Sequence, residues 1–186
     1  MRFDYQTTPT HPRKIQRLME QFLEDASTLT YFDDDLEMEV KRQVQIRKCK
    51  SGFCTDTDPE DESIVAIFYD FTDLDQTKTS PHVFNQEVRA SAPFTKGIAD
   101  VTIALLHELG HNVVLSDLPS DYHRPTELYN IIVASRGNFA LRCQMYVHME
   151  DEWAATQWAI DWLSDPENRR KARAFERAFF KAWRGE

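Results

Sequence analysis

The sequence predicts an α+β fold in which a helix is followed by a small mixed sheet and then by further helices. Near both ends of the chain, apolar residues recur every three or four positions, which is the period of a helix. Between about 38 and 90 they alternate or form β-branched runs, which are typical of strands. The chain has 186 residues, 41% hydrophobic and 12% aromatic, so we expect one domain over 1–186.

The first expected helix covers residues 12–27, because Pro12 can open a helix and five apolar residues then share one face. Those residues are Ile15, Leu18, Met19, Phe22 and Leu23.

The sheet region is expected over 38–90. Alternation over 38–48 predicts one strand, the run SIVAIFYDF over 63–71 predicts a buried strand, and 82–90 is a third candidate. The acidic segment TDTDPEDE over 55–62 is predicted as a solvated loop, since it lacks the glycine and terminal glutamate of a calcium loop.

The second half of the chain is predicted to be helical in three places. One helix is expected over 98–115, another, rich in tryptophan, over 149–164, and a last one over 167–183. Asp165 and Pro166 separate the last two.

The overall charge limits the classes of partner. With 31 acidic and 22 basic residues, the net charge is −9, so we expect no general affinity for nucleic acid or for an anionic membrane, although a local basic patch is not excluded. The basic stretch 41–50 is better explained as a solvated strand face. No apolar run is long enough for a transmembrane helix, and the first residues, MRFDYQTTPTHPRK, contain no signal-peptide core, so a cytoplasmic location is expected.

Three cysteines do not make a disulfide framework. Cys49 and Cys54 flank Lys-Ser-Gly-Phe, which has the composition of a hairpin tip, and Cys143 stands alone. Free thiols in a reducing compartment are the simplest interpretation.

The segment TIALLHELGHNVV over 102–114 carries the strongest chemical signal. His107 and His111 lie four residues apart, so on a helix they are about 40° apart in azimuth and about 6 Å apart along the axis. Two imidazoles placed in this way can bind one zinc ion, and Glu108, at the edge of the same face, can act as general base toward a metal-activated water. The alternative is a buried helix whose histidines are hydrogen-bonded core residues.

A catalytic zinc site needs a third protein ligand, and the sequence offers two candidates. Asp117 lies ten residues after His107, which is the spacing of the third ligand in the metzincin pattern HExxHxxGxxH or HExxHxxGxxD. That pattern has a glycine where the chain turns, but this sequence has the β-branched Val114 there. Glu152 shares a helix face with small residues and could reach a metal, whereas Glu150 lies on another side of that helix. Glu152 is the preferred ligand.

This combination resembles the gluzincin metallopeptidases, which pair HExxH with a later glutamate on a second helix. Within them it is similar to the ImmA/IrrE-like group, whose second helix follows E-x-x-A-N/D-x-F-A-x-x-L-L. The matching residues here are Glu152, Ala155, Trp158, Ala159, Trp162 and Leu163, and Thr156 stands where the group has Asn or Asp. The resemblance implies a zincin-like domain with His107, His111 and Glu152 as ligands of one Zn²⁺ per chain.

The function expected from this motif is zinc-dependent peptide hydrolysis with Glu108 as the base. The resemblance implies a narrow protein substrate, such as a DNA-binding regulator, which would pair with a strand near the active-site helix; 63–71 or 82–90 could supply that strand. Candidates for stabilising the oxyanion are Tyr122, His123, Tyr146 and His148. The alternative function is a zinc-binding regulatory module with little or no proteolysis.

Overall fold

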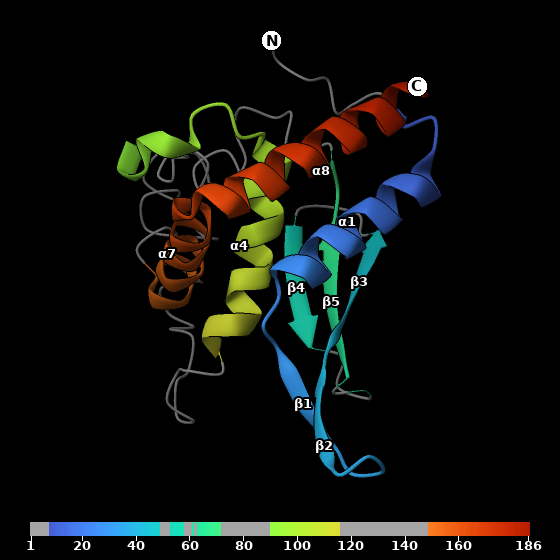
Figure 1. The fold of residues 1–186 in the computed structure, drawn as a ribbon, viewed down its shortest axis with the longest axis vertical. Coiled ribbons are helices and arrows are strands. Elements are labelled where there is room, and N and C mark those ends of the chain that lie inside the picture. The colour runs from blue at the N-terminus through green and yellow to red at the C-terminus, as the bar shows by residue number, and fades with distance from the viewer. Residues whose placement is uncertain (1–7, 49–52, 58–60, 62, 72–89, 116–148) are drawn as a thin grey trace, which may run out of the picture.

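The computed structural model describes residues 8–48, 53–57, 61, 63–71, 90–115 and 149–186, and these form a mixed α+β structure (Figure 1). The helices are α1 (Pro12–Ala26), η1 (Pro93–Thr95, a 3-10 turn), α4 (Asp100–Leu115), α7 (Glu150–Ser164) and α8 (Pro166–Arg184). The strands are β1 (Thr30–Asp33), β2 (Met38–Lys41), β3 (Gln43–Lys48), β4 (Phe53–Thr57) and β5 (Ile64–Tyr69). Among the described residues, no helix is long and apolar enough to cross a membrane.

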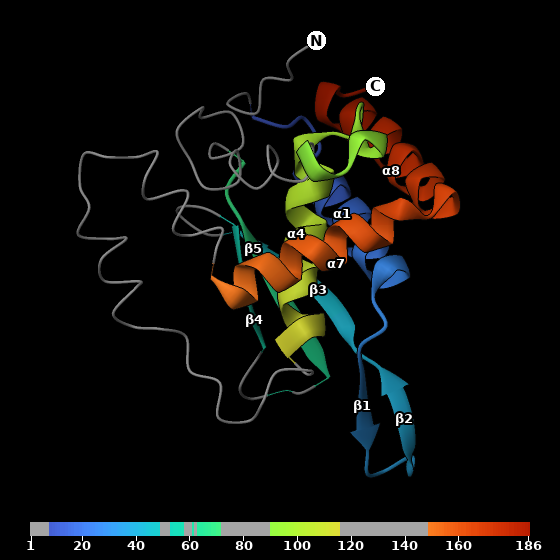
Figure 2. The same ribbon diagram turned by 90° about the vertical axis from the view of Figure 1, so that its left-hand side faces the viewer.

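The main sheet has the strand order β3-β5-β4, with β3 parallel and β4 antiparallel to β5. The helices α1 and α4 pack on it, α8 packs on α1, and α7 packs on α4. The strands β1 and β2 form a separate antiparallel hairpin that projects away from this body (Figures 1 and 2). The helix α4 therefore lies between the sheet and α7.

Burial explains why these segments adopt these elements. The inner residues of α1 and α8 recur at helical spacing, and the buried residues of β3 alternate with partly exposed ones. The core includes Ile15, Met19, Leu23, Val44, Ile46, Val65, Ile67, Leu105, Leu109, Phe175 and Phe179. Every residue of α4 from Val101 to Asn112 is buried, because neighbouring elements cover several sides of this helix.

The prediction of one strand over 38–48 is wrong. The structure divides it at Arg42 into β2 and β3, which belong to different sheets. The backbone nitrogen of Arg42 donates to the carbonyl oxygen of Leu29, and its Nε donates to the carbonyl oxygen of Thr30. These hydrogen bonds hold the corner of the chain at Arg42. Apolar and polar residues alternate on both sides of the corner because each strand has its own period of two, so the sequence pattern does not show the break. The sequence analysis also missed β1, which contains the β-prone residues of Thr30–Asp33.

The predictions between β3 and β5 also need correction. The strands β3 and β4 lie on opposite sides of β5, so Cys49 and Cys54 do not flank the tip of a hairpin. The predicted loop over 55–62 is wrong for residues 55–57, which end β4. Backbone groups make the ladder to β5, so polar residues do not prevent strand formation at a sheet edge. The candidate strand at 82–90 falls on residues outside the described part, apart from Ala90.

Candidate metal centre

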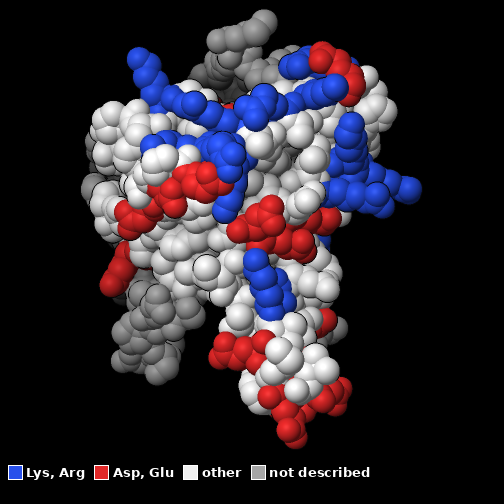
Figure 3. All heavy atoms as spheres, viewed as in Figure 1, with Lys and Arg blue, Asp and Glu red and all other residues white. Residues whose placement is uncertain are grey.

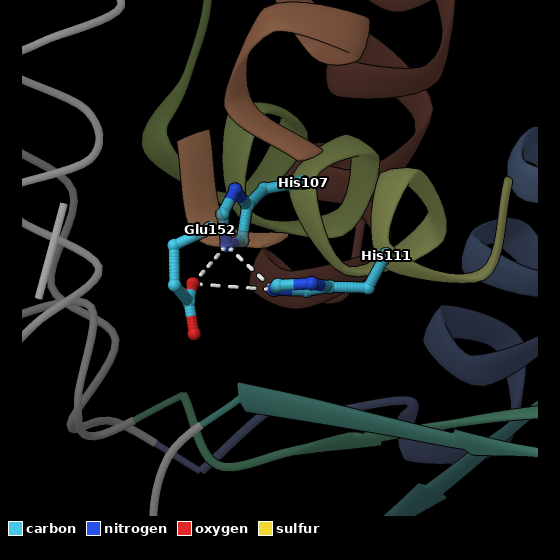
Figure 4. Close-up of side chains that lie close together, drawn as sticks. All are labelled: His107, His111 and Glu152. Atoms are coloured by element: carbon cyan, nitrogen blue, oxygen red, sulfur yellow. Dashed lines mark hydrogen bonds and ion pairs between the residues drawn. The ribbon is translucent and has the colours of Figure 1, made fainter. Parts of the chain in front are cut away.

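The helices α4 and α7 lie side by side and supply three side chains that converge on one point (Figure 4). His107 and His111 come from adjacent turns of α4, and Glu152 comes from the first turn of α7. Their exposed fractions are 3%, 9% and 1%. Among the described residues, they form the group of possible ligand atoms that could hold a metal ion.

The three ligand atoms form a nearly equilateral triangle. The Nε2 atom of His107 lies 3.1 Å from Oε2 of Glu152 and 3.1 Å from Nε2 of His111, and the latter lies 3.2 Å from Oε2 of Glu152. In a tetrahedral zinc site with bonds of 2.0–2.1 Å, ligand atoms lie about 3.3 Å apart. The triangle therefore has close to the size that a bound zinc ion requires.

Hydrogen bonding alone accounts poorly for this triangle. One hydrogen atom on an imidazole nitrogen can point along one edge, but not along both edges that meet there, because the edges diverge by about 60°. A metal ion over the triangle would engage all three lone pairs at once. The residues present thus fit a divalent metal by donor type, spacing and burial.

The pKa values of the two histidines are shifted in opposite directions. Burial lowers the pKa of His107 more than the hydrogen bond to Glu152 raises it. For His111, burial acts in the same downward direction, but the hydrogen bond and negative charge of Glu152 raise the pKa above its usual value. Burial would raise the pKa of Glu152, yet the two histidines hold it far below the usual range. Without metal, Glu152 is therefore ionised, and His111 is the imidazole that more readily carries a proton.

Thr156 sets the orientation of His107. Its Oγ1 atom lies 3.2 Å from Nδ1 of His107, one turn along α7 from Glu152, and it is buried. If Nδ1 carries the hydrogen and donates it to Thr156, Nε2 of His107 keeps its lone pair for a metal. Thr156 occupies the position where Asn or Asp was expected from the resemblance, and its hydroxyl oxygen can accept the same kind of bond.

Glu108 is buried at the same end of α4 but is not among the three converging residues. Its negative charge raises the pKa of His111, which places its carboxylate within electrostatic reach of the site. Asn112 Nδ2 donates to the backbone carbonyl oxygen of Glu108 at 3.2 Å, in addition to the helical bonds of that turn. Glu108 is thus buried beside the two histidines of α4 and lies outside the group of possible ligands.

Of the other predicted site residues, Glu150 is exposed at the start of α7 and takes no part in the cluster. The remaining candidates lie outside the described residues: Asp117, Tyr122, His123, Tyr146 and His148.

A third buried glutamate, Glu176, holds the beginning of α4 and was not predicted from the sequence. Glu176 of α8 accepts hydrogen bonds at its Oε1 from the backbone nitrogen of Ala99 and from Oγ1 of Thr102, both at 2.7 Å. The side chain therefore holds the beginning of α4 from a different helix, where a negative charge is favourable. Its position on the inner face of α8, beside Ala172 and Phe179, is the signal that could have identified it.

Comparison of the sequence with models of protein families gives no match, and neither curated proteins nor solved structures match the chain. Family membership therefore stays a prediction from the HELGH segment and the helix that carries Glu152.

Proposed function

We propose that this chain is a zinc-dependent metallopeptidase of the gluzincin type. In this proposal His107, His111 and Glu152 hold one zinc ion, and Glu108 is the general base. The observation that carries it is the buried triangle of ligand atoms, with edges of 3.1–3.2 Å, built from two neighbouring helices. A zincin-like fold, with the HELGH helix between a sheet and the third-ligand helix, is part of the same proposal.

The donor set favours a catalytic zinc ion over a structural one. Structural zinc sites are usually closed by four ligands and rich in cysteine, whereas catalytic sites use three protein ligands and leave a position open. The group here contains two imidazoles and one carboxylate. The same donors also suit iron(II), but the neighbouring Glu108 supplies the base that hydrolysis requires.

When bound, zinc supplies a Lewis acid and lowers the pKa of its water from 15.7 to about 7. Glu108 would then be the general base that accepts a proton from the attacking water and the acid that returns this proton to the leaving amine nitrogen. With the hydrogen on Nδ1 of His107, Thr156 Oγ1 would accept a hydrogen bond from Nδ1–H and keep His107 in the required orientation.

The main sheet suggests where an extended substrate could bind. Strand β5 is paired on both sides, so the segment 63–71 cannot be the edge strand that the sequence suggested. Within the described sheet β4 is an edge strand, and it packs against α4. Strands of the sheet pass beneath the three side chains in Figure 4. A peptide that added to β4 would therefore run alongside the active-site helix.

The proposed substrate is a specific protein, and the resemblance to the ImmA/IrrE-like group points to a DNA-binding regulator. This substrate class rests on the HELGH segment and the Glu152 helix alone, and it implies weak cleavage of unrelated proteins.

The first test is the metal content of the purified protein, prepared without chelator and measured by mass spectrometry. We expect one zinc ion per wild-type chain and none in His107→Ala or Glu152→Ala. Glu150→Ala is the matched control, because Glu150 is an exposed glutamate on the same helical turn, and it should retain zinc. A wild-type protein without metal would overturn the proposal.

Catalysis is tested separately with Glu108→Gln, which should keep zinc because Glu108 is outside the ligand group. We would incubate wild-type and variant protein with a library of peptides and full-length DNA-binding proteins and map new termini. Cleavage by the wild type, reduced at least a hundredfold in the variant, is expected. If zinc-loaded wild-type protein and zinc-loaded Glu108→Gln gave the same set of termini, the alternative function of a zinc-binding regulatory module would be favoured.

A further inference from the structure

Basic residues gather on two adjacent helices of this acidic chain. The helix α8, PENRRKARAFERAFFKAWR, carries seven Lys or Arg among 19 residues, although the whole chain has a net charge of −9. Figure 3 shows these blue side chains along α8 and at the start of α1, whereas red side chains gather at the projecting hairpin. Red side chains also lie beside the blue ones on this face, so the basic residues are concentrated on these helices without being separated from all acidic ones.

Five cations of α8 form a continuous exposed stripe. Its members are Arg170, Arg173, Arg177, Lys181 and Arg184. Their spacings of three and four residues keep them within about 80° of azimuth and along about 21 Å of helix axis. This face is opposite the buried face of α8, which contains Ala172, Phe175 and Phe179. The core therefore fixes the direction in which the stripe faces solvent.

The start of α1 widens this surface. The backbone nitrogen of Thr10 donates to the carbonyl oxygen of Trp183, so the beginning of α1 lies beside the end of α8. Exposed Arg13, Lys14 and Arg17 line a surface hollow of about 790 Å³ there. We call the five α8 cations and these three residues the basic face.

Few of these charges are neutralised within the protein. Arg170 pairs with Glu167, and Arg184 pairs with Glu186. In the described part of the chain, no ion pair joins Arg173, Arg177 or Lys181 to a carboxylate. Placing uncompensated like charges along one helix costs stability, and a polyanion would remove that cost.

We propose that the basic face binds the phosphate backbone of nucleic acid, contrary to the absence of general nucleic-acid affinity expected from the net charge of −9. Over about 21 Å, one strand of B-form DNA presents about six phosphates, which is comparable to the five cations of the stripe. Such contacts give affinity without reading base sequence. The proposal is independent of the metal centre, whose ligands lie on α4 and α7.

The composition of the face favours nucleic acid over the other anionic partners. A helix that binds a membrane needs exposed apolar residues beside its cations, but Phe175, Phe179 and Trp183 of α8 are buried and Phe180 is half-buried against the core. A protein partner would need an apolar anchor at the centre of the interface. Of the exposed large hydrophobic residues in the described chain, Phe32, Leu36, Met38 and Trp153 lie outside α1 and α8. Phe94 is covered on one face by Arg169 of α8, so it is only one apolar residue at the beginning of that helix.

The test compares two variants of equal net charge in the full-length protein. Arg173→Gln/Arg177→Gln removes two cations from the middle of the stripe. Lys41→Gln/Lys96→Gln removes two exposed cations from outside α1 and α8. Binding to a fluorescent 30-base-pair DNA duplex of random sequence would be measured by anisotropy between 50 and 200 mM salt, with circular dichroism as the check on folding.

We expect wild-type binding that weakens with salt and varies little between duplex sequences. Arg173→Gln/Arg177→Gln should bind the duplex about tenfold more weakly at low salt. In this variant the slope of the logarithm of the binding constant against the logarithm of salt concentration should be smaller in magnitude by about 1.8. The affinity of Lys41→Gln/Lys96→Gln should stay within about twofold of the wild type. No wild-type binding at 50 mM salt would overturn the proposal. Equal effects of both variants would also overturn it, as would binding to vesicles with phosphatidylserine but not to the duplex.

Discussion

Gly110 of α4 lies directly against the backbone of Ala155 in α7. A Cβ atom placed on Gly110 would lie 2.7 Å from the carbonyl oxygen and 3.1 Å from Cα of Ala155, closer than real side chains approach. The glycine thus lets the two helices approach until His111 and Glu152 share one site. This explains why a residue that weakens helices stands in the middle of one.

Gly110→Ala is therefore expected to separate α4 from α7. The clash should lower the free energy of unfolding by about 1–3 kcal/mol. Alanine has the higher helix propensity, which offsets about 1 kcal/mol of this loss. The same clash should weaken zinc binding. Chemical unfolding and a competitive zinc titration measure the two effects. No substitution at Ala155 can relieve a clash with its backbone.

Gly97→Ala is the control for this variant, because no atom lies within 4 Å of the added Cβ and the backbone there is left-handed with φ of 88°. It should cost about 1 kcal/mol of strain and leave zinc affinity unchanged. Equal zinc affinity in both glycine variants would show that the close helix contact does not support the metal centre.

Thr156→Val should weaken zinc binding by about 10- to 100-fold while preserving side-chain shape, because Nδ1 of His107 loses its hydrogen-bond partner. Thr156→Ser should restore most of the affinity. Thr102→Val is the matched control: Thr102 is also buried, but its hydroxyl donates to Glu176. The Thr102→Val variant should be less stable than the wild type but should bind zinc with the same affinity. If Thr102→Val weakened zinc binding and Thr156→Val did not, Thr156 would not orient His107.

Removing the metal should destabilise the protein, since a bound ion stabilises the folded state that contains its site. Zinc at a free concentration of about 100 Kd should add about 2.7 kcal/mol, which corresponds to a rise in Tm of about 5–10 °C for a domain of this size. Calorimetry with chelator and then with zinc gives the shift. His107→Ala should show none, and a similar shift in that variant would place the metal elsewhere.

Zinc affinity should fall as the pH decreases. In the metal-free protein the pKa of His111 is raised above 6.5, that of His107 is lowered, and that of Glu152 is lowered. Below the raised pKa of His111 the ion must therefore displace a proton from His111, and in that range affinity should drop about tenfold per pH unit. Well above the raised pKa, His111 releases no proton, and the proton released on binding should come from the zinc-bound water, whose pKa is about 7.

Titration calorimetry in two buffers with different ionisation enthalpies measures the number of protons released. Release of two protons near pH 6.5 would show that both histidines are charged in the metal-free site, contrary to the lowered pKa of His107.

The sequence determined the parts of this protein that depend on local periodicity. The spacing of apolar residues predicts the helices, and the pentapeptide HELGH puts His107 and His111 on one side of a helix whatever surrounds it. The position of Glu152 among small residues also identified it as the third member of the group before any packing was known. The helices and the shared face of His107 and His111 follow from backbone geometry within one element, whereas the approach of Glu152 to them requires α7 to pack on α4.

Tertiary structure decided what depends on contacts between distant segments. The corner at Arg42 and the central position of β5 come from backbone pairing that residue patterns do not encode. The prediction of one strand over 38–48 was therefore wrong, whereas the buried strand predicted over 63–71 is confirmed as β5 but is not an edge strand. The roles of Thr156 and Glu176 become visible only when α7 and α8 pack on α4. Likewise, a net charge says nothing about how charges are arranged, and only packing gathers the cations of α1 and α8 into one face.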